Sequence, residues 1–139
     1  MIADSSVWIA WLRRGDDASV LRLDAALHQR EVQLLPVVLQ EVLQGAATPE
    51  RFRAWERALS VLMVANSDDP RRTAVLAAGL YARCRWAGFT IRSANDCLIA
   101  ASCIELGQPL LHRDSDFDRI AAIEPALSIV PLQTQCRGN

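Results

Sequence analysis

The chain has 139 residues, of which 51% are hydrophobic and 22% are charged, and its formal net charge is −1. This length fits one domain, because domains typically hold about 100–200 residues, and the hydrophobic fraction is sufficient for a core. The composition excludes a disordered, collagen-like or coiled-coil chain, so we expect a single domain over residues 1–139.

Short apolar runs alternate with helical patterns along the chain. A strand of three residues leads into Asp4, and a helix over 5–12 follows. The further predicted helices cover 20–30, 37–44, 49 to about 62, 70–86, 94–106 and 114–123, and the further predicted strands cover 32–35, 61–64, 110–112 and 127–130. Parallel strands need crossover helices, so this alternation predicts an α/β fold, a three-layer sandwich whose central, mostly parallel sheet is flanked by helices.

The four cysteines, Cys84, Cys97, Cys103 and Cys136, form no C-x-x-C pair, and the chain has only two histidines. A zinc site is therefore not expected. No charged-then-apolar leader opens the sequence, and no apolar run approaches the roughly 18 residues of a membrane span. The sequence predicts a cytoplasmic protein with reduced thiols and no membrane partner.

Acidic residues follow the predicted strands. Asp4 follows the first strand, Asp114 and Asp116 follow strand 110–112, and Asp96 lies in the first turn of helix 94–106. Ligands of open parallel sheets bind outside the carboxyl ends of the strands, so these positions are the first candidates for a site.

Each acid also has an ordinary structural explanation. Asp4 could merely cap the first helix, Asp114 could be a solvated residue at a helix start, and Ser93 with Asp96 resembles a capping box. Glu41 shares a helix face with Val37 and Val38, where a carboxylate needs a partner or must reach water.

Together, however, these acids would repel one another at one sheet edge unless a cation neutralised them. Carboxylates are hard oxygen ligands, which favours Mg²⁺ or Mn²⁺. Such ions can activate a water and stabilise the oxygens of a phosphodiester during displacement. The cluster therefore predicts metal-dependent phosphodiester cleavage.

Four segments in this order resemble the PIN-domain ribonucleases, and specifically the VapC-type toxins of bacterial toxin–antitoxin pairs. They are Asp4-Ser5-Ser6, Glu41-Val42-Leu43-Gln44-Gly45, Asn95-Asp96-Cys97-Leu98-Ile99-Ala100-Ala101 and His112-Arg113-Asp114-Ser115-Asp116-Phe117. The resemblance covers essentially the whole chain. It implies an endoribonuclease that uses Mg²⁺ or Mn²⁺, a homodimer, and inhibition by a small VapB-like antitoxin.

The resemblance also implies roles for individual residues. The catalytic set would be Asp4, Glu41, Asp96, Asp114 and Asp116. Asp4 and Asp96 would hold the principal ion, Asp114 or Asp116 would complete that site or position a second ion, and Glu41 would bind through water or orient the nucleophile. Ser6 and Ser93 match positions that border the site in the family, and Arg113 is a third substrate-binding candidate because it adjoins Asp114.

Two features depart from the family pattern. The strand before Asp4 is short, and His112 stands where Thr or Ser is common, with packing as the favoured role. Two other interpretations stay open: an RNA-processing PIN nuclease without an antitoxin, and a PIN-fold binding module without catalysis. A haloacid-dehalogenase-like phosphatase and a response-regulator receiver both need a lysine, and the chain has none.

Overall fold

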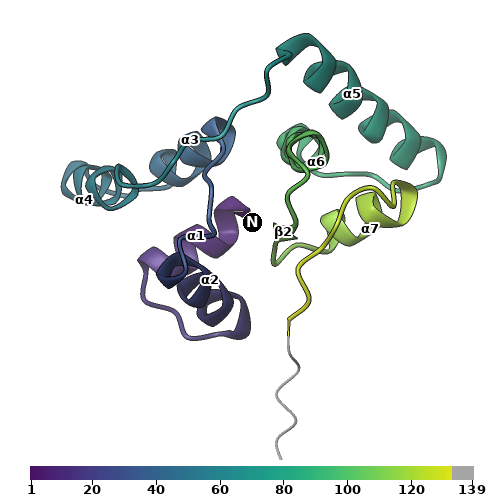
Figure 1. Cartoon of the computed structure of the whole chain (residues 1–139). Helices are drawn as coiled ribbons and strands as arrows, with labels where there is room; N and C mark the ends of the chain where they lie inside the picture. Colours follow the sequence, from purple (N-terminus) through teal and green to yellow (C-terminus); the bar gives the residue numbers. More distant parts are fainter. Residues whose placement is uncertain (133–139) are drawn as a thin grey trace, which may run out of the picture.

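The structure, a computed structural model, describes residues 1–132 (Figure 1). Its two strands are β1 (Ile2–Ala3) and β2 (Leu110–Leu111). Its helices are α1 (Ser5–Leu12), α2 (Ala18–His28), α3 (Pro36–Gln44), α4 (Pro49–Leu59), α5 (Pro70–Trp86), α6 (Ala94–Leu106) and α7 (Ser115–Ile123). Residues 133–139, which the predicted domain includes, lie outside the described part.

The sheet is parallel and narrow. β1 pairs with β2, with Ile2 opposite Leu110 and Ala3 opposite Leu111. Single parallel bridges extend it on both sides: Ile2 to Gln33, Leu34 to Val64, and Leu110 to Ile129. The predicted α/β fold with a parallel sheet is confirmed, but the runs 32–35, 61–64 and 127–130 form single bridges rather than full strands. Pro36 and Pro131 follow two of these runs and prevent the ladder from continuing, because proline cannot donate to it.

Side-chain caps and prolines set where most helices begin. Pro36, Pro49 and Pro70 each stand in the first turn of a helix. The predicted helix 20–30 instead begins at Ala18, because the Asp17 carboxylate accepts from the backbone N–H groups of Ser19 and Val20. It ends at His28, two residues before Arg30 takes a left-handed φ of 57°. The helix predicted to reach about residue 62 ends at Leu59.

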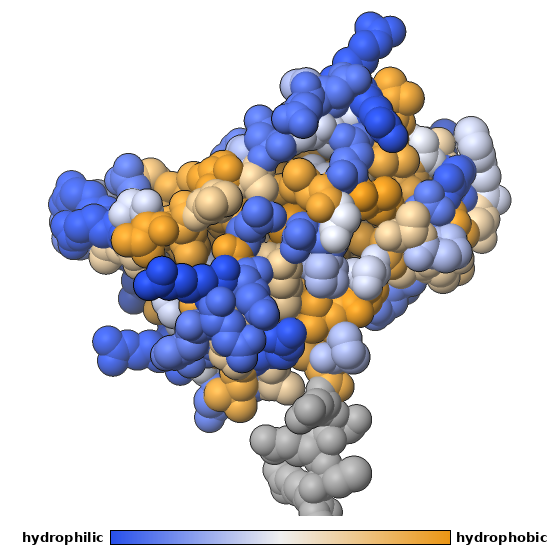
Figure 2. All heavy atoms as spheres, in the orientation of Figure 1, coloured by the Kyte–Doolittle hydropathy of each residue, from blue (hydrophilic) through white to orange (hydrophobic). Residues whose placement is uncertain are grey.

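The helices form two groups on either side of the sheet (Figure 1). One group contains α1 to α4, the other contains α5 to α7, and α3 contacts α6 between them. Ile2, Trp8, Leu110, Leu111 and Phe117 are fully buried in the core that these layers share. On the surface, hydrophilic side chains cover much of the face in Figure 2, and apolar side chains reach solvent between them. Among residues 1–132, no helix is both long and apolar enough to cross a bilayer.

Candidate metal centre

The predicted acids come from four elements that end or begin at one edge of the sheet. Asp4 directly follows β1 and caps α1, and Asp114 comes three residues after Leu111 of β2 and caps α7. Asp96 lies in the first turn of α6, and Glu41 lies on α3, which packs against α6. Because parallel strands end at the same edge, the local capping roles of Asp4 and Asp114 also bring their carboxylates toward one place.

Three of these carboxylates lie close enough to hold one ion. Oxygen atoms of Asp96, Asp114 and Asp116 all lie within 4.8 Å of one another. The charges of Asp4 and Glu41 also act on Asp96. The structure thus brings all five predicted acids into one neighbourhood.

Asp4 is held rigidly and is almost completely buried. The Ser6 hydroxyl donates to its Oδ1 at 2.9 Å, and the Val7 N–H donates to the same oxygen at 3.2 Å. Burial raises the pKa of Asp4 to about 6, although these two hydrogen bonds act in the opposite direction. A cation bound beside Asp4 would favour its charged form and lower this pKa again.

Asp96 is the most strongly perturbed acid of the set. Burial raises its pKa to about 7, and the negative charges of Asp114, Glu41, Asp4 and Asp116 add to the effect in that order. The capping-box alternative fails here, since Ser93 makes no side-chain capping bond at the N-terminus of α6. Asp96 therefore faces its acidic neighbours without the structural role that the sequence also allowed.

Glu41 gives a direct test of whether this site fits a metal ion. Its Oε1 atom is buried and has no hydrogen-bond partner within the described residues. An orphaned carboxylate oxygen is costly in a protein interior. All the donors are hard oxygen atoms, so the residues present fit a divalent ion such as Mg²⁺ or Mn²⁺. Either a directly bound ion or its water could satisfy Glu41 Oε1.

Asp116 differs from the other acids because arginines already neutralise it. It is fully buried, and its Oδ1 accepts from Nη1 of Arg119 at 2.8 Å. Its Oδ2 accepts from the backbone N–H of Arg92 at 3.0 Å and from Arg92 Nε at 3.4 Å. Burial acts to raise the pKa of Asp116, but the hydrogen bonds from Arg92 and the charges of Arg92 and Arg119 outweigh it and lower this pKa.

Arg92 reaches a second acid of the cluster. Its Nη2 atom lies 2.8 Å from Asp114 Oδ1, the oxygen that also accepts from the Asp116 N–H at 3.0 Å. Sequence patterns alone single out neither Arg92 nor Arg119. The signal that could have found Arg92 is its position, because it immediately precedes Ser93, the N-cap of the helix that carries Asp96.

The predicted substrate-binding residues are placed differently from one another. The Ser6 hydroxyl donates to Asp4, so Ser6 borders the cluster. Ser93 is half-buried at the N-terminus of α6. Arg113 extends to Asp17, with Nη2 3.3 Å from Oδ2, so Arg92 rather than Arg113 is the arginine on the cluster. His112 packs against Phe117 with ring centroids 5.3 Å apart, and its Nε2 lies 3.1 Å from Asp118 Oδ1, in agreement with the packing role.

Comparison with known proteins shows the family of the chain. Residues 1–123 match the PIN domain family, and the chain therefore belongs to that family. Within it, the chain belongs with the VapC ribonucleases. It is 34% identical over 125 residues to VapC ribonuclease Mb1587 of Mycobacterium bovis and, equally, to ribonuclease VapC11 of Mycobacterium tuberculosis, a match that covers 88% of this chain and 92% of each relative.

A solved structure shows the same fold at lower sequence similarity. The structure titled "Crystal Structure of FitAcB from Neisseria gonorrhoeae" superposes with a TM-score of 0.69 at 16% identity. The match covers 94% of this chain and 96% of the other. This likeness agrees with the PIN fold that the sequence segments predicted.

Proposed function

We propose that this PIN-domain protein is a divalent-metal-dependent endoribonuclease and the toxin of a type II toxin–antitoxin pair. The observation that carries the proposal is the meeting of Asp96, Asp114 and Asp116 within 4.8 Å, next to Asp4 and Glu41, in a chain that is 34% identical to VapC ribonucleases. The clustered charge has little structural benefit without a cation, whereas phosphodiester hydrolysis requires one at such a site.

The structure supports a division of roles within the cluster. Asp4, Asp96 and Asp114 would hold Mg²⁺ or Mn²⁺, which when bound supplies a water of lowered pKa and positive charge for the phosphate oxygens. Ser6 and the Val7 N–H fix the orientation of the Asp4 carboxylate. Glu41, with its free Oε1, is placed to accept a hydrogen bond from the attacking water and so orient it.

Between Asp114 and Asp116, the geometry favours Asp114 as the metal ligand. Both oxygens of Asp116 already accept hydrogen bonds from arginines, Oδ1 from Arg119 Nη1 at 2.8 Å and Oδ2 from the Arg92 backbone N–H at 3.0 Å. Asp114 makes its hydrogen bonds through Oδ1, to the Asp116 N–H and to the exposed side chain of Arg92. Asp116 would then position its neighbours and lie behind the ion rather than bind it.

RNA cleavage by the purified chain tests this function. We expect cutting of RNA with Mg²⁺ or Mn²⁺, none with EDTA, and none by Asp96→Asn, whose circular dichroism spectrum should match that of the wild type. Asp118→Asn is the matched control, because Asp118 is largely exposed and the side-chain hydrogen bond given for it in the described structure is to His112. If neither metal binding by calorimetry nor cleavage of any RNA is found, the non-catalytic binding module replaces this proposal.

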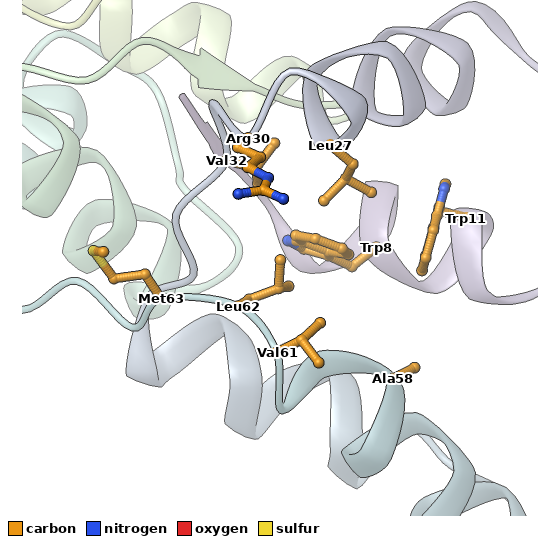
Figure 3. A pocket seen from close by; sticks show the side chains of 9 residues that line it. All are labelled: Trp8, Trp11, Leu27, Arg30, Val32, Ala58, Val61, Leu62 and Met63. Carbon is orange, nitrogen blue, oxygen red and sulfur yellow. The ribbon is translucent and has the colours of Figure 1, made fainter.

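An antitoxin would need a docking surface, and the chain offers an apolar pocket of about 600 Å³ away from the acids (Figure 3). Trp8 and Trp11 of α1 and Val61 and Leu62, which follow α4, point into it. Trp8 Nε1 is buried there without a hydrogen-bond partner among residues 1–132. Grooves of this kind accept amphipathic helices through aromatic anchors. We therefore place the antitoxin helix in this pocket.

The pocket assignment can be tested with two valine variants. Val61 is 85% exposed and lines the pocket, whereas Val75 is 66% exposed on α5 and does not. Val61→Glu should weaken binding of a candidate VapB-like antitoxin by about 10-fold or more, because a carboxylate would enter an apolar contact. Val75→Glu should bind like the wild type. If the wild type and both variants bind the antitoxin with equal affinity, the antitoxin does not bind in this pocket. If none of them binds it, the nuclease without an antitoxin is favoured.

Homodimer formation and a cytoplasmic location complete the proposal. The resemblance to VapC-type toxins supports the dimer, and light scattering at micromolar concentration measures it; a monomer would contradict it. Three described cysteines, Cys84, Cys97 and Cys103, are buried free thiols, which suits a reducing compartment.

A further inference from the structure

Arg92 joins the acidic cluster in two distinct ways, through its backbone and through its side chain. The backbone N–H donates to Asp116 Oδ2 at 3.0 Å and fixes the main chain just before α6. The guanidinium lies on the solvent side, with the side chain 72% exposed, and its Nη2 lies 2.8 Å from Asp114 Oδ1. The side chain can therefore move while its backbone stays in place.

The two arginines on Asp116 are not equivalent. Arg119 lies one turn after Asp116 on α7 and donates to Oδ1 at 2.8 Å. Arg92 Nε lies 3.4 Å from Oδ2, which the Arg92 backbone N–H already occupies. If the Arg92 side chain leaves, Asp116 keeps one donor on each oxygen, so the buried carboxylate stays satisfied.

If the Arg92 side chain moves away, Asp114 loses its ion pair with this arginine. Within the described residues, Arg92 is the one guanidinium that contacts it. Asp114 is also one of the three acids whose oxygens lie within 4.8 Å of one another. A divalent ion bound to Asp114 would lie close to the Arg92 guanidinium, which contacts the same carboxylate. The two positive charges would repel each other.

We propose that Arg92 is an internal counter-ion of the metal-free site, which neutralises Asp114 until a divalent ion binds and displaces its side chain. Arg92 is thus a positioning residue that lowers the affinity of the site for metal while keeping the free acidic cluster stable. The inference rests on the proposed function, because it assumes that Asp114 serves a divalent ion.

Metal affinity measured by calorimetry tests the proposal directly. Arg92→Gln should bind Mn²⁺ about 2- to 5-fold more tightly than the wild type, the range expected from losing one exposed ion pair. Arg92→Lys keeps the charge and should stay close to the wild type. Arg113→Gln is the matched control, because it removes the same charge one residue from Asp114 but from a side chain that contacts Asp17.

The outcomes separate this inference from the proposed function. If Arg92→Gln binds Mn²⁺ equally or more weakly, or if Arg113→Gln tightens binding as much, direct competition at Asp114 is wrong, even though the wild type binds metal and cuts RNA. If the wild type neither binds metal nor cuts RNA, the proposed function fails as well.

A second measurement uses the wild-type protein alone, so it does not depend on whether a variant folds. The NMR signal of the Arg92 Nε–H group in the wild type should shift when diamagnetic Mg²⁺ is added, and that of Arg119 should shift much less. Equal responses, or no response of Arg92 at saturating Mg²⁺, would overturn the displacement.

Discussion

The acidic cluster has two halves that the protein treats in opposite ways. Among residues 1–132, no arginine pairs with Asp4, Glu41 or Asp96, which are wholly or partly buried, and the pKa values of Asp4 and Asp96 rise to about 6 and about 7. Asp114 and Asp116 are bound by arginines, and the pKa of Asp116 falls below its usual range. The first half has no arginine on its carboxylates among the described residues, whereas the second contacts two arginines. In our proposal, the number of carboxylates in the cluster therefore exceeds the number of metal ligands.

The largest expected effect separates the two halves by activity. Asp96→Asn should lower kcat/KM for RNA cleavage by about 100-fold or more, because in the proposed mechanism it removes a ligand of the divalent ion. Asp116→Asn should cost only about 10-fold, as is typical of residues that orient a ligand. Single-turnover cleavage at saturating Mn²⁺ measures both. Equal losses would show that Asp116 binds the ion itself.

Stability should respond in the reverse order. Asp116→Asn should lower the free energy of unfolding by about 2–3 kcal/mol, because Arg92 and Arg119 lose the charge that they share at a fully buried site. Urea unfolding in EDTA measures the difference, and Asp118→Asn, at an exposed position, controls for the substitution. A stability equal to that of the wild type would mean that the arginines do not depend on Asp116.

The half of the cluster that contains Asp4, Glu41 and Asp96, which we call the uncompensated half, should make the metal-free protein less stable at higher pH. The folded-state pKa of Asp4 is about 6, above its ordinary 3.8, so the folded chain binds this proton more tightly than the unfolded chain. That contribution is present below about pH 4 and is lost as the pH rises through 6. Asp116 has a lowered pKa, and its own contribution is lost only at lower pH.

Thermal or urea unfolding in EDTA at pH 5 and pH 8 measures this dependence. We expect the free energy of unfolding to fall by about 2 kcal/mol or more between these values, because Asp4 and Asp96 both lose a proton in this range. Asp4→Asn should remove part of the slope, since Asp96 still titrates, while Oδ1 at position 4 keeps the cap on α1. An unchanged slope in this variant would assign the pH dependence to other groups.

The contrast also marks what the sequence could and could not predict. The positions of Asp4, Asp96 and Asp114 follow from strand ends and a helix start, which short-range patterns indicate, so their convergence was predictable. The partners of Asp116 were not, because they depend on how the segment before α6 brings the Arg92 backbone against α7. Fifteen arginines and no lysine gave no local signal that distinguished Arg92 or Arg119 from the rest.

The sheet shows the same limit on a smaller scale. Alternation of apolar runs with helices predicted a parallel sheet, and the sheet is present. The length of each strand depended on pairing with distant segments and on the flanking prolines, so Val64 and Ile129 contribute one bridge each. Long-range pairing of this kind is not encoded in a short apolar run.

The smallest expected effect concerns Glu41 and should change sign with metal. In EDTA, Glu41→Gln should raise the free energy of unfolding by about 0.5–1 kcal/mol. The substitution removes one negative charge from a group of acids that repel one another, and Glu41 Oε1 is buried without a hydrogen-bond partner among the described residues. At saturating Mn²⁺ the wild type should become the more stable protein, because it binds the ion more tightly and binding stabilises the folded state. Paired unfolding curves with and without Mn²⁺ measure both signs. A variant that is more stable under both conditions would place Glu41 outside the metal centre and leave Asp4 and Asp96 as the whole of the uncompensated half.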